Sequence, residues 1–215
     1  MSFDPVPVRT QVAEKTWRLI WWARSMIRPT RYSRLVYEQP YIWVSPRDIV
    51  YKTARAFRVR RYHGAILDGE WDTLGYLFED LDVYRAFRAR FFEGAAWSQT
   101  EFYQRVLRNI ADGKTKFGCR TKEEFDRRCK RLDALYQEVA REGMRINPSE
   151  PSRDISVNIG RHGHILFNEG RHRLSMGKLL DLPIIPVRIA VQHAAWVRLG
   201  AVARDYLERH AKSPT

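Results

Sequence analysis

The chain has 215 residues, 44% of them hydrophobic, so it can bury a sizeable core as one domain with additions or as two small domains. Its 38 Lys and Arg residues outnumber 25 Asp and Glu residues, which leaves a formal net charge of +13. This composition excludes an intrinsically disordered chain. It favours polyanionic partners such as nucleic acid, phosphorylated ligands or an anionic membrane surface, although a solvated basic surface would give the same charge.

The two cysteines, Cys119 and Cys129, are ten positions apart and form no CxxC pair. They fit reduced thiols and support neither a disulfide framework nor a cysteine zinc site. No apolar run approaches the ~18 residues that a membrane-spanning helix needs. The first ten residues also lack the basic and then apolar order of a signal peptide. We therefore expect a soluble, cytoplasmic protein.

Residues 1–35 are predicted to form a basic, tryptophan-rich helical extension. Helical spacing of Trp17, Ile20 and Trp21 supports a helix within 12–34, and Pro29 is expected to end it. Such a helix could lie on an anionic membrane surface as a peripheral contact. Alternatively, its tryptophans pack onto the core of the protein itself while its arginines face water.

Residues 36–215 are predicted to form a single α+β domain with a small mixed sheet. Tyr41–Val44 is rich in strand-forming residues, and Ser45-Pro46 should stop that strand and begin a short helical turn. Three amphipathic patterns then predict a large helical insertion at about 79–143. Ser98 or Thr100 is expected to cap the second helix and Thr121 the third, and glycines are expected to end them. In the first of these helices, the predicted apolar face includes Tyr84, Phe87 and Phe91.

The last third changes to the strand, strand, helix, strand, helix order of a compact α+β unit. "DISVNI" and "HILF" are predicted to pair as a hairpin across Gly160–Gly163, and a helix is expected from about Gly170 to Leu180. "PIIPVRIAV" supplies another strand, and residues 196–209 are predicted to form one final helix.

The turn between the second hairpin strand and its helix carries the sequence Glu169-Gly170-Arg171-His172-Arg173. The first N–H groups of a helix have no intrahelical partners, and the helix dipole adds partial positive charge there. Gly170 would let an anion approach the backbone, and the basic residues would surround it, as in an anion-binding site. The alternative is an internal salt network in which Glu169 neutralises its basic neighbours.

The segment "ISVNIGRHGHILFNEGRHRLSMGKLLDLPIIPVRIAV" resembles the core of the ParB/sulfiredoxin-like superfamily, with the match clear over roughly 135–191. The resemblance implies a nucleotide phosphate site in which Gly170 is the box glycine and His172 and Arg173 are the phosphate-facing pair. Sulfiredoxins require a cysteine where this chain has Arg171, and ParB proteins carry glutamate there. The free-serine kinases of this superfamily have an acid where this chain has Glu169.

The leading hypothesis is a nucleotide-binding protein, ParB-like in fold, that acts as a phosphoryl-transfer enzyme on a small molecule. ATP, ADP or CTP would bind at Gly170, Arg171, His172 and Arg173, while Glu169 acts as the catalytic base or holds Mg²⁺. Asp68, Glu70 and Asp72 are candidate metal ligands, with an ordinary acidic turn as the alternative.

A non-catalytic nucleic-acid or anionic-surface binder is the competing hypothesis. Arginines 55, 58, 60 and 61 would contact phosphates, while Phe57 and Tyr62 would stack on bases. No helix-turn-helix signature follows the core, which argues against a role in DNA partition.

Overall fold

The computed structural model describes residues 41–54, 64–146 and 154–211, together with residues 19, 20, 23, 26, 27, 36, 57 and 62. Almost all of the predicted 1–35 extension, including its tryptophans, lies outside these residues. The chain divides into two compact units. We call residues 1–78, 145–170 and 183–215 the sheet unit, and residues 79–144 with 171–182 the helical unit. Within the described ranges, none of the helices combines the length and apolar character needed to cross a bilayer.

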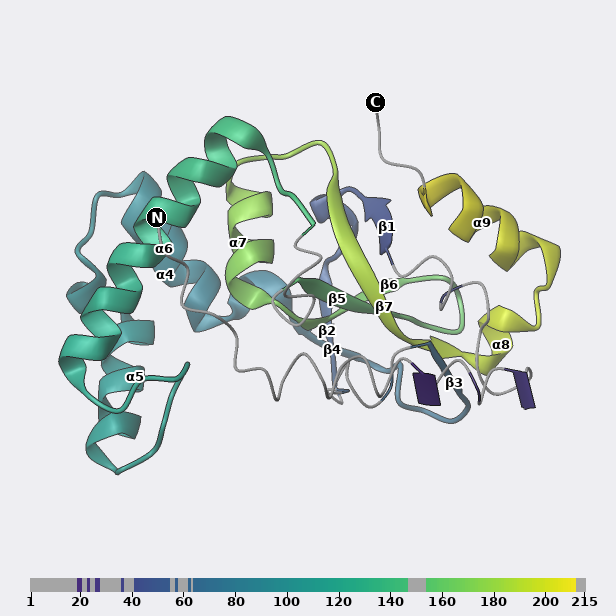
Figure 1. Ribbon diagram of the computed structural model, residues 1–215, viewed down its shortest axis with the longest axis horizontal. Coiled ribbons are helices and arrows are strands. Elements are labelled where there is room, and N and C mark those ends of the chain that lie inside the picture. Colours follow the sequence, from purple (N-terminus) through teal and green to yellow (C-terminus); the bar gives the residue numbers. More distant parts are fainter. Residues whose placement is uncertain are drawn as a thin grey trace. The chain divides into compact units, whose positions relative to one another are not determined.

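The sheet unit is built on a mixed seven-stranded sheet, so the chain is of the α+β class (Figure 1). Its strands follow the order β1-β7-β5-β6-β2-β4, with β3 also paired to β7. β7 runs antiparallel to β1 and parallel to β5 and β3, whereas β5 and β6 form an antiparallel hairpin. β2 joins β6 in parallel and β4 in antiparallel pairing. The strands are β1 Tyr41–Val44, β2 Tyr51–Thr53, β3 Ala65–Leu67, β4 Leu74–Leu77, β5 Ile155–Ile159, β6 Ile165–Glu169 and β7 Ile185–His193.

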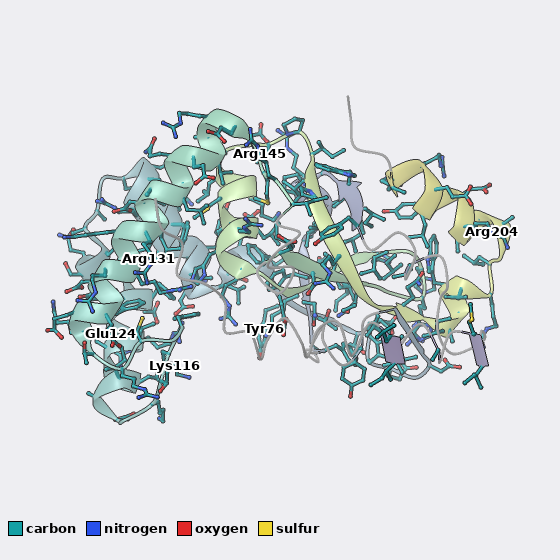
Figure 2. All side chains as sticks on the ribbon, in the orientation of Figure 1. Tyr76, Lys116, Glu124, Arg131, Arg145 and Arg204 are labelled. Carbon is teal, nitrogen blue, oxygen red and sulfur yellow. The ribbon has the colours of Figure 1, made fainter. Side chains whose placement is uncertain are left out.

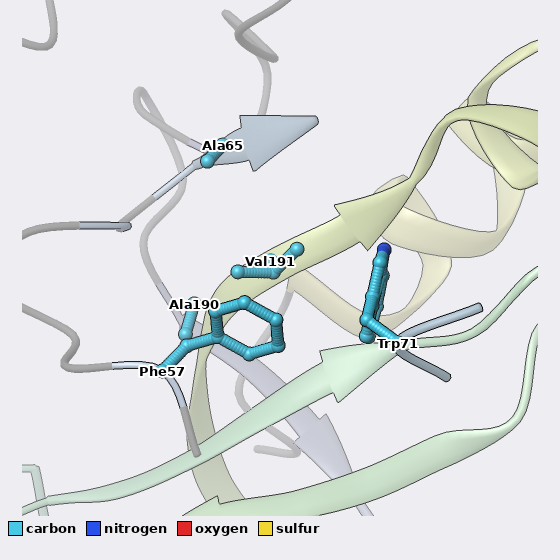
Figure 3. Packing of buried hydrophobic residues seen from close by; sticks show 5 residues of the cluster. All are labelled: Phe57, Ala65, Trp71, Ala190 and Val191. Atoms are coloured by element: carbon cyan, nitrogen blue, oxygen red, sulfur yellow. The ribbon is translucent and has the colours of Figure 1, made fainter. Parts of the chain in front are cut away.

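Every residue of β5 and β7 is buried, which shows that both faces of the central strands are covered. One buried cluster consists of Phe57, Ala65, Trp71, Ala190 and Val191 (Figure 3). The rings of Phe57 and Trp71 meet edge to face with centroids 5.3 Å apart. This cluster joins the chain around residues 57–71 to the middle of β7.

Asn168, in β6, fastens Phe57 to the sheet. Its side-chain Oδ1 accepts from the Phe57 N–H at 2.8 Å, and its Nδ2 donates to the Phe57 carbonyl at 2.6 Å and to Ser156 Oγ at 3.0 Å. The amide thereby satisfies both backbone groups of a residue that belongs to no strand. This pairing explains why a polar side chain occupies a buried position of β6.

Local signals placed several elements of the sheet unit correctly. Tyr41–Val44 is a strand, and Ser45 accepts a hydrogen bond from the Arg47 N–H at the start of the 3-10 helix η1, Pro46–Asp48. The β5–β6 hairpin is also confirmed. The single final helix is wrong, because Gly200 with φ +58° separates α8, Ala194–Val197, from α9, Ala201–Ala211.

The helical unit contains α7 packed against α4 and α6 (Figure 1). Its helices are α4 Asp82–Phe92, α5 Glu101–Ala111, α6 Lys122–Glu142 and α7 Arg171–Leu179, with the 3-10 helix η3 at Trp97–Gln99. The 3-10 helix η2, Phe78–Asp80, precedes α4 in sequence. The predicted face of α4 is rotated, because Val83, Ala86 and Phe87 are its buried residues while Tyr84 is only half-buried.

Candidate functional site

The turn after β6 contains two residues of the sheet unit, Glu169 and Gly170. Gly170 has φ +94°, and a Cβ atom there would lie 2.7 Å from Ile155 Cα and 3.1 Å from the Asp154 carbonyl oxygen. The close approach that requires glycine is therefore made by the backbone that enters β5. Glu169 is half-buried at the end of β6, opposite Ser156. The close contact with the Ile155 backbone is therefore sufficient to explain the glycine at position 170, without a bound anion.

Three predicted phosphate ligands belong to the helical unit, in the first turn of α7. Arg171 is exposed and Arg173 is half-buried, and both have interaction partners within the protein. This turn contains no acidic residue. Cationic side chains at the amino end of a helix are electrostatically unfavourable there unless an anion compensates them. The amino end of α7 is therefore basic, and an anion there would complement its charge.

His172, the second residue of α7, points into an aromatic cluster. Its ring centroid lies 5.8 Å from that of Phe87, 5.9 Å from Phe102 and 5.1 Å from Phe117. Nε2 is shielded from solvent and has no hydrogen-bond partner. Burial, with the positive charges of Arg128 and Arg171, lowers the pKa of His172 to about 3, so the imidazole is neutral at physiological pH. The imidazole of His172 faces the ring of Phe117 and so is not exposed as a phosphate ligand.

Further basic side chains lie along α6, among them Arg131 (Figure 2). Arg128 lies over the Phe117 ring, with Cζ 5.3 Å from the centroid. Burial raises the pKa of the Cys119 thiol, and the negative charge of Glu124 acts in the same direction, whereas Arg128, Arg131 and Arg127 act against it. We call Arg128, Arg171 and Arg173 the cationic cluster, because Arg128 and Arg171 act electrostatically on His172 and Arg173 follows it in the first turn of α7. The sequence did not reveal it, because its members come from helices that are distant along the chain.

The acidic turn 68–72 has a different role from the predicted metal site. Arg161 donates to Asp72 through Nη2 at 2.7 Å and Nε at 3.0 Å, and its backbone N–H donates to the same carboxylate at 2.7 Å. Nη2 also bonds Glu70 at 3.0 Å. His193 Nδ1 accepts from the Ala195 N–H, so Nε2 carries the proton donated to the Gly69 carbonyl at 2.9 Å. This network binds the turn to the β5–β6 hairpin.

These acids do not converge with Glu169 and Gly170. Arg161 lies in the hairpin turn before β6, whereas Gly170 follows the last residue of β6. The five residues of that strand extend about 13 Å from end to end. Among the described residues, no group of three or more His, Cys, Asp or Glu side chains could hold a metal ion. Asp68, Glu70 and Asp72 therefore do not fit a Mg²⁺ site that serves the Gly170 turn.

A hollow of about 420 Å³ lies on the helical unit between α4 and α6. Arg90 donates to both carboxylate oxygens of Asp133, at 3.0 and 3.1 Å, and the Trp97 indole donates to the same carboxylate at 2.9 Å. The charged groups along this hollow already bind one another, so the hollow offers less to an anionic ligand than the amino end of α7.

The basic cluster proposed for nucleic acid lies mostly outside the described residues, since arginines 55, 58, 60 and 61 are among those not described. Phe57 is described and fully buried, with its ring 5.2 Å from that of Tyr62. It packs into the sheet and so is not exposed for stacking on a base. Comparisons with protein-family models, curated proteins and solved structures gave no significant match.

Proposed function

We propose that this chain is a nucleotide-binding protein that holds the phosphates of ATP, ADP or CTP at the amino end of α7. The observation that carries the proposal is the cationic cluster around this helix end, whose first turn contains no acid. First-turn N–H groups, which lack intrahelical partners, and the helix dipole favour an anion at this end, and planar guanidinium groups suit phosphate oxygens. The ParB/sulfiredoxin-like resemblance of residues 135–191 supports the same ligand class.

Because the acids of the 68–72 turn lie apart from Glu169, we propose nucleotide binding and not phosphoryl transfer. Phosphoryl transfer relies on charges that position and neutralise the transferring group. Of the predicted second set of acids, Glu70 and Asp72 are bound to Arg161, which lies in the turn before β6. Glu169 is the acid that precedes Gly170 in sequence, and any transfer reaction would depend on it. A Glu169→Gln variant should then lose product formation while still binding nucleotide.

Calorimetric titration of ATP and CTP, each with and without Mg²⁺, tests the proposal. We expect saturable binding that weakens about 10-fold or more in Arg171→Gln and Arg173→Gln, because a hydrogen bond to a charged group contributes about 1.5–3 kcal/mol. Arg141→Gln changes the charge equally at an exposed position of α6 and should bind as the wild type does. If neither nucleotide gives heat or raises the melting temperature, the proposal fails.

A second candidate function, binding of an extended polyanion such as DNA or RNA, is favoured by the distribution of charge. Residues 9–61 contain 13 Lys and Arg residues but only three acidic residues, and so account for ten of the 13 net positive charges. Such a segment would contact phosphates without reading sequence.

A further inference from the structure

The turn that carries Phe117 holds a large aromatic residue in a backbone conformation that suits other residues better. Backbone hydrogen bonds of 3.0 and 2.8 Å join Lys116 and Cys119 in both directions. Phe117 and Gly118 between them have φ +53° and +76°. Two central residues with positive φ characterise a type I′ turn, for which Asn-Gly is preferred and phenylalanine is unusual. The geometry of the turn therefore does not explain the choice of phenylalanine.

The surroundings of the Phe117 ring give a better explanation. The ring lies among flat groups: Phe102 with its centroid 5.7 Å away, His172 at 5.1 Å, and the Arg128 guanidinium at 5.3 Å. Aromatic rings and guanidinium planes are the groups on which proteins stack nucleobases. His172 adds a shielded Nε2 that has no hydrogen-bond partner and that a phenylalanine ring cannot satisfy. A planar ring with a polar edge would use this nitrogen.

We propose that Phe117 occupies a nucleobase subsite of the helical unit and that a nucleotide binds by displacing it. The base takes the place of the Phe117 ring, lies under the Arg128 guanidinium and tilted against Phe102, and forms one edge hydrogen bond with His172 Nε2. His172 is the second residue of α7, so a base held there places its phosphates near the amino end of the same helix. This inference rests on the proposed function and specifies how that function selects a nucleoside.

The Phe117→Asn variant tests this subsite without removing the turn, since Asn-Gly suits a type I′ conformation. Removal of the Phe117 ring should strengthen ATP or CTP binding about 10-fold. In the wild type, only the fraction of molecules in which the ring has left the subsite can bind a base, whereas in the variant all of them can. Inorganic tripolyphosphate, which has no base, should bind wild type and variant equally. Phe92→Asn is the matched control, as Phe92 is 62% exposed on α4 of the same unit.

A second substitution examines the edge contact. His172→Phe in the Phe117→Asn background keeps a flat ring but removes the nitrogen, and should weaken nucleotide binding about 10-fold while tripolyphosphate binding stays the same. Phe117→Gly, which also accepts positive φ, replaces Phe117→Asn if that variant melts at a much lower temperature.

The results separate the two proposals. If tripolyphosphate and nucleotides bind, but opening the subsite leaves nucleotide affinity unchanged or weaker in a folded variant, the nucleobase subsite is refuted and phosphate binding stands. If neither tripolyphosphate nor nucleotide binds to any of these proteins, the proposed function is refuted and the subsite with it.

Discussion

Among single residues, Asp72 is the acid of the 68–72 turn whose carboxylate is most buried and most strongly held in its ionised form. Its side chain is only 5% exposed, compared with 66% for Asp68 and 82% for Glu70. Burial by itself would raise the pKa of Asp72. Hydrogen bonds from the side chain and backbone of Arg161 outweigh that effect, and the pKa falls from 3.8 to about 2. The ionised form of Asp72 therefore stabilises the fold.

This shift predicts how stability depends on pH. Because the folded pKa lies below the unfolded value, the contribution of Asp72 is present above about pH 4 and is lost as the pH falls toward 2. It amounts to roughly 2 kcal/mol. Urea unfolding at neutral and acidic pH should show this loss in the wild type but not in Asp72→Asn. Asp205→Asn, at an exposed position of α9, should behave as the wild type does. Equal acid sensitivity in Asp72→Asn and wild type would contradict the assignment.

Gly170 can be compared with Gly69, a residue of nearly the same backbone angle. Their φ values are +94° and +96°, but a Cβ at Gly69 would meet nothing within 4 Å. Alanine at Gly69 should cost about 1–2 kcal/mol for the left-handed backbone alone. Alanine at Gly170 should cost roughly 1–3 kcal/mol more, because Cβ would collide with the Ile155 backbone. Melting temperatures test the difference, and equal losses in the two variants would rule out the clash.

Among the helices, α6 shows how one capping residue fixes the start of an element. Thr121 Oγ1 accepts from the Glu124 N–H, and the Glu124 carboxylate accepts from the Arg120 N–H at 2.6 Å. The predicted cap Thr121 is thereby confirmed, and the Glu124 carboxylate accepts from the N–H of the residue before the cap. Gly143 ends the helix with φ +71°.

Loss of this cap has a measurable consequence. Thr121→Ala should reduce the free energy of unfolding by about 1 kcal/mol, because the Glu124 N–H loses its acceptor. Thr121→Ser keeps a hydroxyl oxygen in the same place and should retain most of that stability. Chemical denaturation followed by circular dichroism measures both variants. An alanine variant as stable as the serine variant would show that the cap contributes little.

Elements with strong local signals were predictable from sequence, whereas those set by distant contacts were not. Thr121 marked the start of α6, Thr100 is the cap of α5 among the two candidates Ser98 and Thr100, and Gly160–Gly163 marked the hairpin. The three-residue strands β2 and β3 gave no periodic pattern, because their pairing partners β6 and β7 lie far along the chain. The orientation of His172 depends on Phe87, Phe102 and Phe117, which no local rule associates with α7. Its packing was therefore not predictable.

For the molecule as a whole, the net charge of +13 is unevenly distributed along the chain. Residues 1–34 contain seven basic and two acidic residues, so their deletion removes five net positive charges. If the polyanion function holds, the shortened protein should bind duplex DNA more weakly and with a smaller salt dependence, since fewer counterions are released. Fluorescence anisotropy at increasing salt measures both quantities. Unchanged affinity and slope would exclude these residues from the interface.

The helical unit takes its fourth helix from a later part of the chain, because residues 145–170 of the sheet unit separate 79–144 from 171–182. During translation, the aromatic side chains that surround His172 must therefore wait for α7. At about 5–20 residues per second, the ribosome needs roughly 2–8 s to extend the chain from residue 144 to 182. For that interval the nascent polypeptide exposes the apolar side chains that α7 later covers, and we expect it to be recognised by chaperones.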